Sequence, residues 1–287
     1  MTVFAYLYVK KRTFLNQTHH RKDPIATMSS QKVILITVDG MRPDGFLASG
    51  SPYIEEMCAK SYYSLDAQSV VPPVTLPVHT SIFCSVPPAR HGILTNTYVP
   101  QVHEVEGLTA ILRRAKKQCA MFYGWEQLRD VTRPKELTYA EFVKARSFEN
   151  SDTYLCERAA NCLRSYHPDF LFLHLVETDE KGGHDCGWMS EEYLRLIRVA
   201  LEGVIGIVRE FAQEYHIIVE ADHGGHDRTH GLEIPEDMTV PIFYFSPELP
   251  AGTRFHGGSL LDIAPTVADL MGVEPDAGWE GRSLIPG

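Results

Sequence analysis

The chain has 287 residues, of which 44% are apolar, and its 37 acidic against 27 basic residues give a formal charge of -10. This length suffices for one large α/β domain or two small ones. Because affinity for a nucleic-acid backbone depends on Lys and Arg, an acidic chain is a poor general binder, and we expect no specific nucleic-acid binding. A small phosphate substrate is still allowed, because bound divalent metal ions would reverse the local charge.

Residues 1–30 differ in composition from the rest of the chain. The apolar stretch at 1–8 is too short to span a membrane, and the charges that follow it stand in the wrong order for a signal peptide. We predict a disordered extension over 1–30 and no membrane association. A native start at Met28 is one hypothesis for this extension, and an intact mass that includes residues 1–27 would rule it out.

The six cysteines show no paired spacing. Most of them stand in predicted strands or helices, where a free cysteine behaves as a small buried hydrophobic residue. This pattern is typical of a reducing compartment, and we expect a cytoplasmic protein.

Strands and helices alternate along the body of the chain. The apolar, β-branched run at 32–38 predicts a strand buried on both faces. The elements predicted after it are a loop and a helix at 52–60, an extended stretch at 62–71, helices at about 76–84 and 107–118, a strand at 119–124, a helix at 151–165, a strand at 170–176, a helix at 190–214, strands at 217–220 and 240–245, and a helix at 260–271. This alternation predicts one α/β domain over 31–287, with a mostly parallel central sheet flanked by helices.

Three of the predicted buried strands are followed by an acidic residue. Asp39 ends the first, Asp179 comes shortly after the strand at 170–176, and Asp222 follows the strand at 217–220. Ligands collect at the carboxyl edge of open parallel sheets. One such Asp is usually a helix cap, but three together favour a metal site.

The segment 221–231 reads Ala-Asp-His-Gly-Gly-His-Asp-Arg-Thr-His-Gly, with three histidines and two aspartates within nine positions. Imidazole nitrogen and carboxylate oxygen suit zinc, manganese or iron, and the glycines allow sharp turns that bring ligands together. A solvated polar loop is the alternative interpretation. The density of ligand types directly after a buried strand favours the metal site.

Thr75 stands between prolines at the predicted start of a helix. The amino end of a helix offers free N–H groups and a positive dipole, which suit a phosphoryl oxyanion. From these residues alone, the simpler interpretation is that Thr75 only caps the helix.

The order of these motifs resembles the alkaline phosphatase superfamily, in particular its type I phosphodiesterase/nucleotide pyrophosphatase branch. The motifs are Asp39-Gly40, Thr-x-Pro-x-His at 75–79, the His-Gly-Ile-Leu-Thr-Asn segment at 91–96, Asp179 with Gly183-His184, and Asp222-His223-Gly224. Each motif is weak alone, but the ordered set is specific and covers about residues 32–287. The resemblance implies an alkaline phosphatase-like catalytic domain without a large cap insertion.

The resemblance also implies two divalent metal ions, with zinc expected and manganese as the alternative. By matching motif, one ion would be held by Asp39, Thr75, Asp222 and His223, and the other by Asp179, His184 and His230. Thr75 would attack phosphorus and form a phospho-threonine. Asn96, helped by the Leu76 backbone N–H, would bind a non-bridging phosphate oxygen.

The second ligand set leaves alternatives open. His184 follows Asp179 by five residues, whereas the family spacing is four. Glu180 could therefore take the carboxylate role, with Asp185 as a remoter option, but we prefer Asp179, because it lies nearer the strand end.

Three further histidines need an interpretation. His226 and His256 are alternatives to His230, and His226 could also support a ligand without binding metal. His79 could be mistaken for a general base, but with a metal to activate Thr75 a structural role is favoured.

The expected function is hydrolysis of a small phosphodiester or pyrophosphate ester of the nucleotide type. Phosphomonoester or phosphonate hydrolysis by the same site, phosphosugar mutase chemistry, and a non-catalytic metal-binding relative are the alternatives. Related mutases have a large inserted domain, for which 287 residues leave little room. A sulfatase is rejected, because the Cys-x-Pro-x-Arg-like segment at 84–90 has the wrong spacing. The sequence leaves the oligomeric state open.

Overall fold

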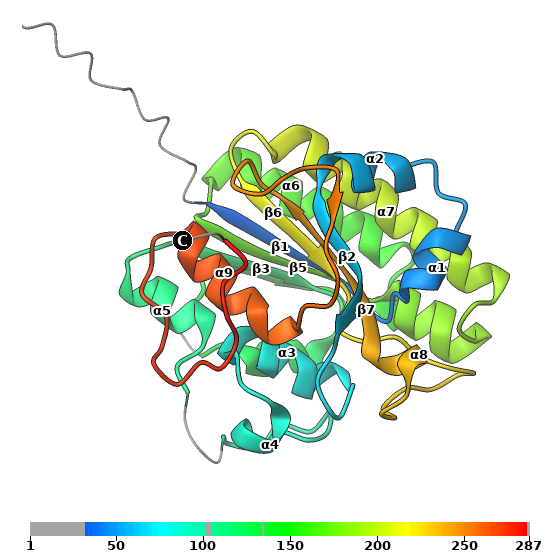
Figure 1. Cartoon of the computed structure of the whole chain (residues 1–287), viewed down its shortest axis with the longest axis horizontal. Coiled ribbons are helices and arrows are strands. Elements are labelled where there is room, and N and C mark those ends of the chain that lie inside the picture. Colours follow the sequence, from blue (N-terminus) through cyan, green and yellow to red (C-terminus); the bar gives the residue numbers. More distant parts are fainter. Residues whose placement is uncertain (1–31, 102–104, 134, 286–287) are drawn as a thin grey trace, which may run out of the picture.

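The computed structural model describes residues 32–101, 105–133 and 135–285. The strands are β1 (Val33–Val38), β2 (Tyr62–Gln68), β3 (Cys119–Tyr123), β4 (Tyr139–Phe142), β5 (Phe170–Leu175), β6 (His216–Glu220), β7 (Thr239–Phe245) and β8 (Thr253–Arg254). They form one sheet in the order β4-β3-β5-β1-β6-β7-β2-β8 (Figure 1). The extension predicted at 1–30 lies outside the described residues.

The sheet is parallel except at one strand. The strands from β4 to β6 pair in parallel, whereas β7 is antiparallel to both β6 and β2. The predicted α/β fold with a mostly parallel central sheet is confirmed.

Helices cover both faces of the sheet. They are α1 (Pro43–Ala48), α2 (Ile54–Lys60), α3 (Thr75–Cys84), α4 (Pro88–His91), α5 (Leu108–Arg114), α6 (Ser151–Tyr166), α7 (Glu191–Phe211), α8 (Pro235–Met238) and α9 (Ile263–Leu270). Helices α3, α5 and α9 pack together on one side, and α6 and α7 lie side by side on the other (Figure 1). No helix of the described residues combines the length and apolar character needed to cross a bilayer.

The three central strands β5, β1 and β6 are buried along their whole length. Both faces are covered by helices, which is why these strands read as continuous apolar runs without alternation. Because they are adjacent and parallel, their carboxyl ends meet at one edge of the sheet. The acidic residues that follow them are therefore brought to one place.

Several short elements differ from the sequence prediction. Helix α1 forms where a loop was predicted, and the helix predicted at 52–60 begins at Ile54. The final helix, predicted over 260–271, is a 3₁₀ turn at Leu260–Asp262 followed by α9. Strands β4 and β8 were missed, because runs of four and two residues are too short to show a period.

All six cysteines are free, and four of them are buried: Cys84, Cys119, Cys156 and Cys162. The interpretation of most cysteines as small buried residues is confirmed. The reducing compartment stays a prediction.

Two glycines of α7 provide a matched test of the packing between α6 and α7. A Cβ at Gly203 would lie 2.5 Å from the Cys156 Sγ, whereas a Cβ at the exposed Gly206 meets nothing within 4 Å. We expect Gly206→Ala to raise the free energy of unfolding by about 0.5–1 kcal/mol, because alanine favours the helix. Gly203→Ala should lower it by about 1–3 kcal/mol through overpacking.

Urea unfolding of both variants checks this difference. Adding Cys156→Ala to Gly203→Ala should recover most of the lost stability, because the clashing sulfur is removed. Equal effects at the two glycines would contradict the observed packing of α6 on α7.

Candidate functional site

Asp39, Asp222, His223 and Thr75 meet at the carboxyl ends of β1 and β6 and the start of α3. The Nε2 atom of His223 lies 3.4 Å from Asp39 Oδ1 and 3.3 Å from Asp222 Oδ2. It also lies 3.2 Å from the Thr75 hydroxyl oxygen. All four residues are buried. Of the four residues predicted to share one metal, three therefore surround the Nε2 atom of the fourth, His223.

Thr75 is the first residue of α3, and Val74 occupies the N-cap position without a side-chain cap. The interpretation of Thr75 as the N-cap is therefore wrong. Its hydroxyl faces His223 instead, and the residue is only 4% exposed. This leaves the hydroxyl available for chemistry at the amino end of the helix.

Asn96 lies over the first turn of α3. The Leu76 backbone N–H donates to Asn96 Oδ1 over 3.0 Å. The structure thus brings Asn96 beside Thr75, as predicted. The Leu76 N–H is bonded to Asn96 here, and its role towards phosphate stays a prediction.

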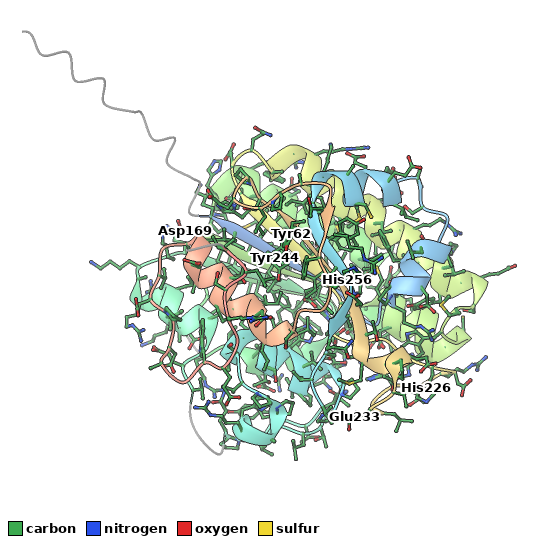
Figure 2. All side chains as sticks on the ribbon, viewed as in Figure 1. Tyr62, Asp169, His226, Glu233, Tyr244 and His256 are labelled. Atoms are coloured by element: carbon green, nitrogen blue, oxygen red, sulfur yellow. The ribbon has the colours of Figure 1, made fainter. Side chains whose placement is uncertain are left out.

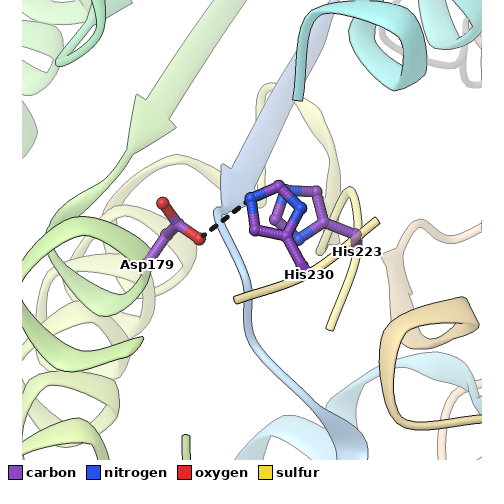
Figure 3. Close-up of side chains that lie close together, drawn as sticks. All are labelled: Asp179, His223 and His230. Carbon is purple, nitrogen blue, oxygen red and sulfur yellow. Dashed lines mark ion pairs between the residues drawn. The ribbon is translucent and has the colours of Figure 1, made fainter. Parts of the chain in front are cut away.

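The second predicted group lies against the first. His184 Nε2 is 3.5 Å from Asp179 Oδ2, and His230 Nε2 is 4.0 Å from Asp179 Oδ1. The His230 ring stacks on the His223 ring with their centroids 3.8 Å apart (Figure 3). Donor atoms of Asp179, His223 and His230 also lie within 4.8 Å of one another, so His223 stands between the two groups.

A π-helix accounts for the unusual spacing between Asp179 and His184. Residues Thr178–Cys186 form this helix. Its backbone bonds span five residues, compared with four in an α-helix, so it can absorb one extra residue. The five-residue spacing therefore still places His184 beside the Asp179 carboxylate.

The alternatives to Asp179 point elsewhere. Glu180 lies 3.7 Å and Asp185 3.2 Å from nitrogens of the Arg146 guanidinium. Asp179 is buried and faces His184 and His230. The geometry favours Asp179 as the carboxylate of this group.

His226 and His256 lie outside both groups. His226 Nδ1 is 2.7 Å from Asp237 Oδ1, beside α8 (Figure 2). The other Asp237 oxygen accepts the backbone N–H groups of Gly231 and Leu232, so this pair braces the loop that carries His230. His256 is exposed and bonds to Asp66 over 2.8 Å.

His79 does not contact the Thr75 hydroxyl. Its Nδ1 lies 2.8 Å from the Thr75 backbone carbonyl, one helical turn earlier. This contact fits the structural role predicted for His79.

Each of the three candidate histidine ligands is oriented in the same way. The Nδ1 atoms of His184, His223 and His230 lie 3.0, 2.8 and 2.9 Å from backbone carbonyl oxygens, those of Arg228, Gly224 and Pro73. A carbonyl can only accept, so each Nδ1 carries the proton and each Nε2 presents a lone pair. Metal-binding histidines typically have this second contact.

The carboxylates also fit a metal site. Asp39 Oδ1, Asp179 Oδ1 and Asp222 Oδ2 are buried and, among the described residues, accept no hydrogen bond. A tetrahedral ion with bonds of about 2.0–2.2 Å holds neighbouring donor atoms about 3.3–3.6 Å apart. The contacts of 3.3–3.5 Å around His223 and His184 match this spacing. The residues present therefore fit divalent ions with nitrogen and oxygen ligands.

The electrostatics of the site follow from burial. Burial raises the pKa of Asp39 well above its usual value, and the nearby Asp222 and Asp179 raise it further. Burial also raises the pKa of Asp179 to about 6. Burial opposes ionisation of Asp222 too, but His223 and two other histidines outweigh it and hold its pKa below the usual value.

Burial favours the neutral form of two of the candidate histidine ligands, His223 and His230. It lowers the pKa of His223, and it lowers that of His230 to about 4, where repulsion between the two rings if both were protonated acts in the same direction. A neutral imidazole is the form that binds metal.

The sequence prediction gave no role to His174, Trp188 and Tyr193. His174 Nε2 lies 3.0 Å from Asp39 Oδ2. Trp188 and Tyr193 both donate to the Gly40 carbonyl, which fixes the turn after Asp39. The signal for His174 was a lone polar residue in the apolar run of β5. No pattern in the sequence indicated the other two.

Comparisons with known proteins agree with this geometry. The family model of type I phosphodiesterase/nucleotide pyrophosphatase matches residues 33–236. The 2,3-bisphosphoglycerate-independent phosphoglycerate mutase of Haloquadratum walsbyi is 32% identical over 158 residues, which are 53% of this chain and 30% of the mutase. The chain thus spans less than a third of that relative.

Solved structures share the fold. Murine ectonucleotide pyrophosphatase/phosphodiesterase 5 aligns with a TM-score of 0.72 and 13% identity, over 85% of this chain and 96% of that one. A 2-O GAG sulfatase aligns with a TM-score of 0.72 and 15% identity, over 90% and 74%. At such identities, the likeness shows the fold alone.

The chain has the alkaline phosphatase-like α/β fold. It belongs to the type I phosphodiesterase/nucleotide pyrophosphatase family, as the motifs predicted. Membership supports a phosphoryl-transfer enzyme, either a phosphoester hydrolase or a mutase.

The structure separates His230 from His226, and zinc binding tests this separation. We expect His230→Ala to weaken binding of one of two zinc equivalents by at least about tenfold, because a ligand is lost. His226→Asn, which keeps a donor towards Asp237, should bind both equivalents as the wild type does. Competition with a chromophoric chelator measures both variants, and equal zinc affinity in the two would contradict the assignment.

Proposed function

We propose that the chain is a two-metal hydrolase of phosphodiester or pyrophosphate substrates of the nucleotide type, acting through a phospho-threonine. The observation that carries this proposal is the buried Thr75 hydroxyl at the start of α3, 3.2 Å from His223 Nε2. That nitrogen also faces two carboxylates, so the Thr75 hydroxyl lies against the candidate metal group of Asp39, Asp222 and His223.

In this proposal one ion is held by Asp39, Thr75, Asp222 and His223, and the other by Asp179, His184 and His230. Bound ions supply positive charge that lowers the pKa of an attached hydroxyl or water and stabilises charge on oxygen. Zinc suits these nitrogen and oxygen donors, with manganese as the alternative.

The residues of the chain perform the rest of the chemistry. The Thr75 oxygen forms a bond to phosphorus while the bond from phosphorus to the ester oxygen breaks, and the leaving group departs with that electron pair. The oxygen of water then forms a bond to phosphorus while the bond from phosphorus to Thr75 breaks. The Thr75 oxygen keeps that electron pair and regains a proton from the water, and the phosphate product is released. Because Asn96 Oδ1 accepts the Leu76 N–H, its amide nitrogen is the end that would donate to a phosphoryl oxygen.

Access to water supports hydrolysis. The His184 side chain is 33% exposed, whereas His223 is fully buried. Solvent can therefore reach the group that contains Asp179 more easily than the group around Thr75. A phosphoryl group on Thr75 would meet water from that side.

A mutase is the second candidate function. It is favoured by the 32% identity to a phosphoglycerate mutase, but that match covers only 30% of the mutase. Asn96 follows Leu76 by 20 residues, which leaves no room for a large insertion between them.

Phosphomonoester or phosphonate hydrolysis by the same residues is a further alternative. We also propose a cytoplasmic protein that acts on small phosphate esters.

Substitution of Thr75 tests the nucleophile. We expect Thr75→Ala to lower kcat by at least about 10³-fold, because the attacking oxygen is lost, and Thr75→Ser to retain part of the activity. Thr80→Ala is the matched control, because Thr80 lies on the same helix and its hydroxyl donates to the Leu76 backbone carbonyl, its one hydrogen bond among the described residues. Steady-state kinetics give kcat for all three variants. Wild-type turnover by Thr75→Ala would contradict the assignment of Thr75 as the nucleophile.

A substrate panel separates the candidate activities. Bis-p-nitrophenyl phosphate, p-nitrophenyl phosphate and the nitrophenyl ester of thymidine monophosphate are compared with zinc and with manganese. We expect the highest kcat/KM for the diesters. Preference for the monoester would favour phosphomonoester hydrolysis. No turnover at full metal loading would favour a metal-binding protein without catalytic activity.

A further inference from the structure

His174 is a buried polar residue in the centre of the sheet. It lies near the end of β5, between Leu173 and Leu175, and all three are buried without measurable exposure. Placing an imidazole among apolar residues costs free energy unless its polar atoms find partners. An aliphatic residue would fill this position without that cost, so the contact that His174 makes indicates its role.

The described contacts of His174 lead to one candidate metal ligand. Its Nε2 lies 3.0 Å from Asp39 Oδ2, and its Nδ1 has no hydrogen-bond partner among the described residues. The ring of His79 approaches edge-on, with centroids 5.1 Å apart. A neutral imidazole has one N–H, and here Nε2 must carry it, because only that nitrogen has an acceptor.

This hydrogen bond gives the two carboxylate oxygens of Asp39 different partners. Oδ2 accepts from His174, whereas Oδ1 accepts no hydrogen bond from any residue that the structure describes and lies 3.4 Å from His223 Nε2. A carboxylate held by one oxygen cannot rotate freely about its side-chain bond. Its other oxygen is therefore fixed towards Thr75, Asp222 and His223.

We propose that His174 is a positioning residue, which fixes the Asp39 carboxylate so that Oδ1 faces the metal on the Thr75 side. The inference rests on the proposed function, because it assumes that Asp39 binds a divalent ion. Partners of this type typically contribute a factor of about 10–100 to metal affinity.

Two amide substitutions distinguish the hydrogen bond from simple packing. In His174→Gln the amide nitrogen can reach the place of Nε2, whereas in His174→Asn it reaches only the place of Nδ1. Both variants bury one neutral amide, so their costs to folding are similar. His216→Leu is the control for loss of a buried strand histidine, because His216 lies at the amino end of β6, away from the site.

Zinc affinity is measured by chelator competition on metal-free full-length protein, and the cobalt(II) form provides an absorption spectrum of the coordination. We expect His174→Asn to weaken one of two zinc equivalents by about 10–100-fold and to alter the cobalt spectrum. His174→Gln should stay within about threefold of the wild type, and His216→Leu should lose stability but keep both affinities.

The outcomes separate this inference from the proposed function. If the wild type binds two equivalents and His174→Asn binds them equally well, the positioning role is overturned while the two-metal proposal stands. Equal losses of zinc affinity in His174→Asn and His174→Gln also overturn the positioning role. A wild-type protein that binds no zinc, cobalt or manganese overturns the two-metal proposal and this inference together.

Discussion

The structure depends on the burial of three carboxylates at one edge of the sheet. Asp39 and Asp222 have donor atoms within 4.8 Å of each other, and Asp179 lies beyond them on the far side of β1. At that distance two negative charges repel by about 3 kcal/mol in an effective dielectric of 20. Burial raises the pKa of Asp39, and repulsion from Asp222 and Asp179 raises it further. Two divalent ions would cancel this repulsion, which supports the proposal of a two-metal site.

The backbone around these carboxylates is held in place by contacts that leave the metal-facing atoms free. Carbonyl groups orient His184, His223 and His230 through their Nδ1 atoms. Trp188 packs against Gly183 and Gly225, where a Cβ would lie within 2.6 Å of its ring. The same indole donates to the Gly40 carbonyl. The Trp188 side chain thus contacts the turn after β1, the π-helix and the loop that carries His223 and His230.

The central strands and the main ligands could be predicted from the sequence because each leaves a local signal. Continuous apolar runs predicted β1, β5 and β6, and the acids after them predicted Asp39, Asp179 and Asp222 as neighbours. Contacts made across the fold leave no such signal. The pairing of His226 with Asp237, the π-helix that accommodates the spacing of His184, and the bond from His174 to Asp39 appear only in three dimensions. Short elements such as α1 and β4 were missed because six and four residues are too few to distinguish a helical or strand repeat from chance.

Anomalous diffraction at the zinc absorption edge, from crystals of the zinc-loaded protein, tests the central claim most directly. Our account predicts two peaks, one among Asp39, Thr75, Asp222 and His223, and the other among Asp179, His184 and His230. A single peak, or peaks that lie only at surface carboxylates and histidines such as His256, would contradict the two-metal site.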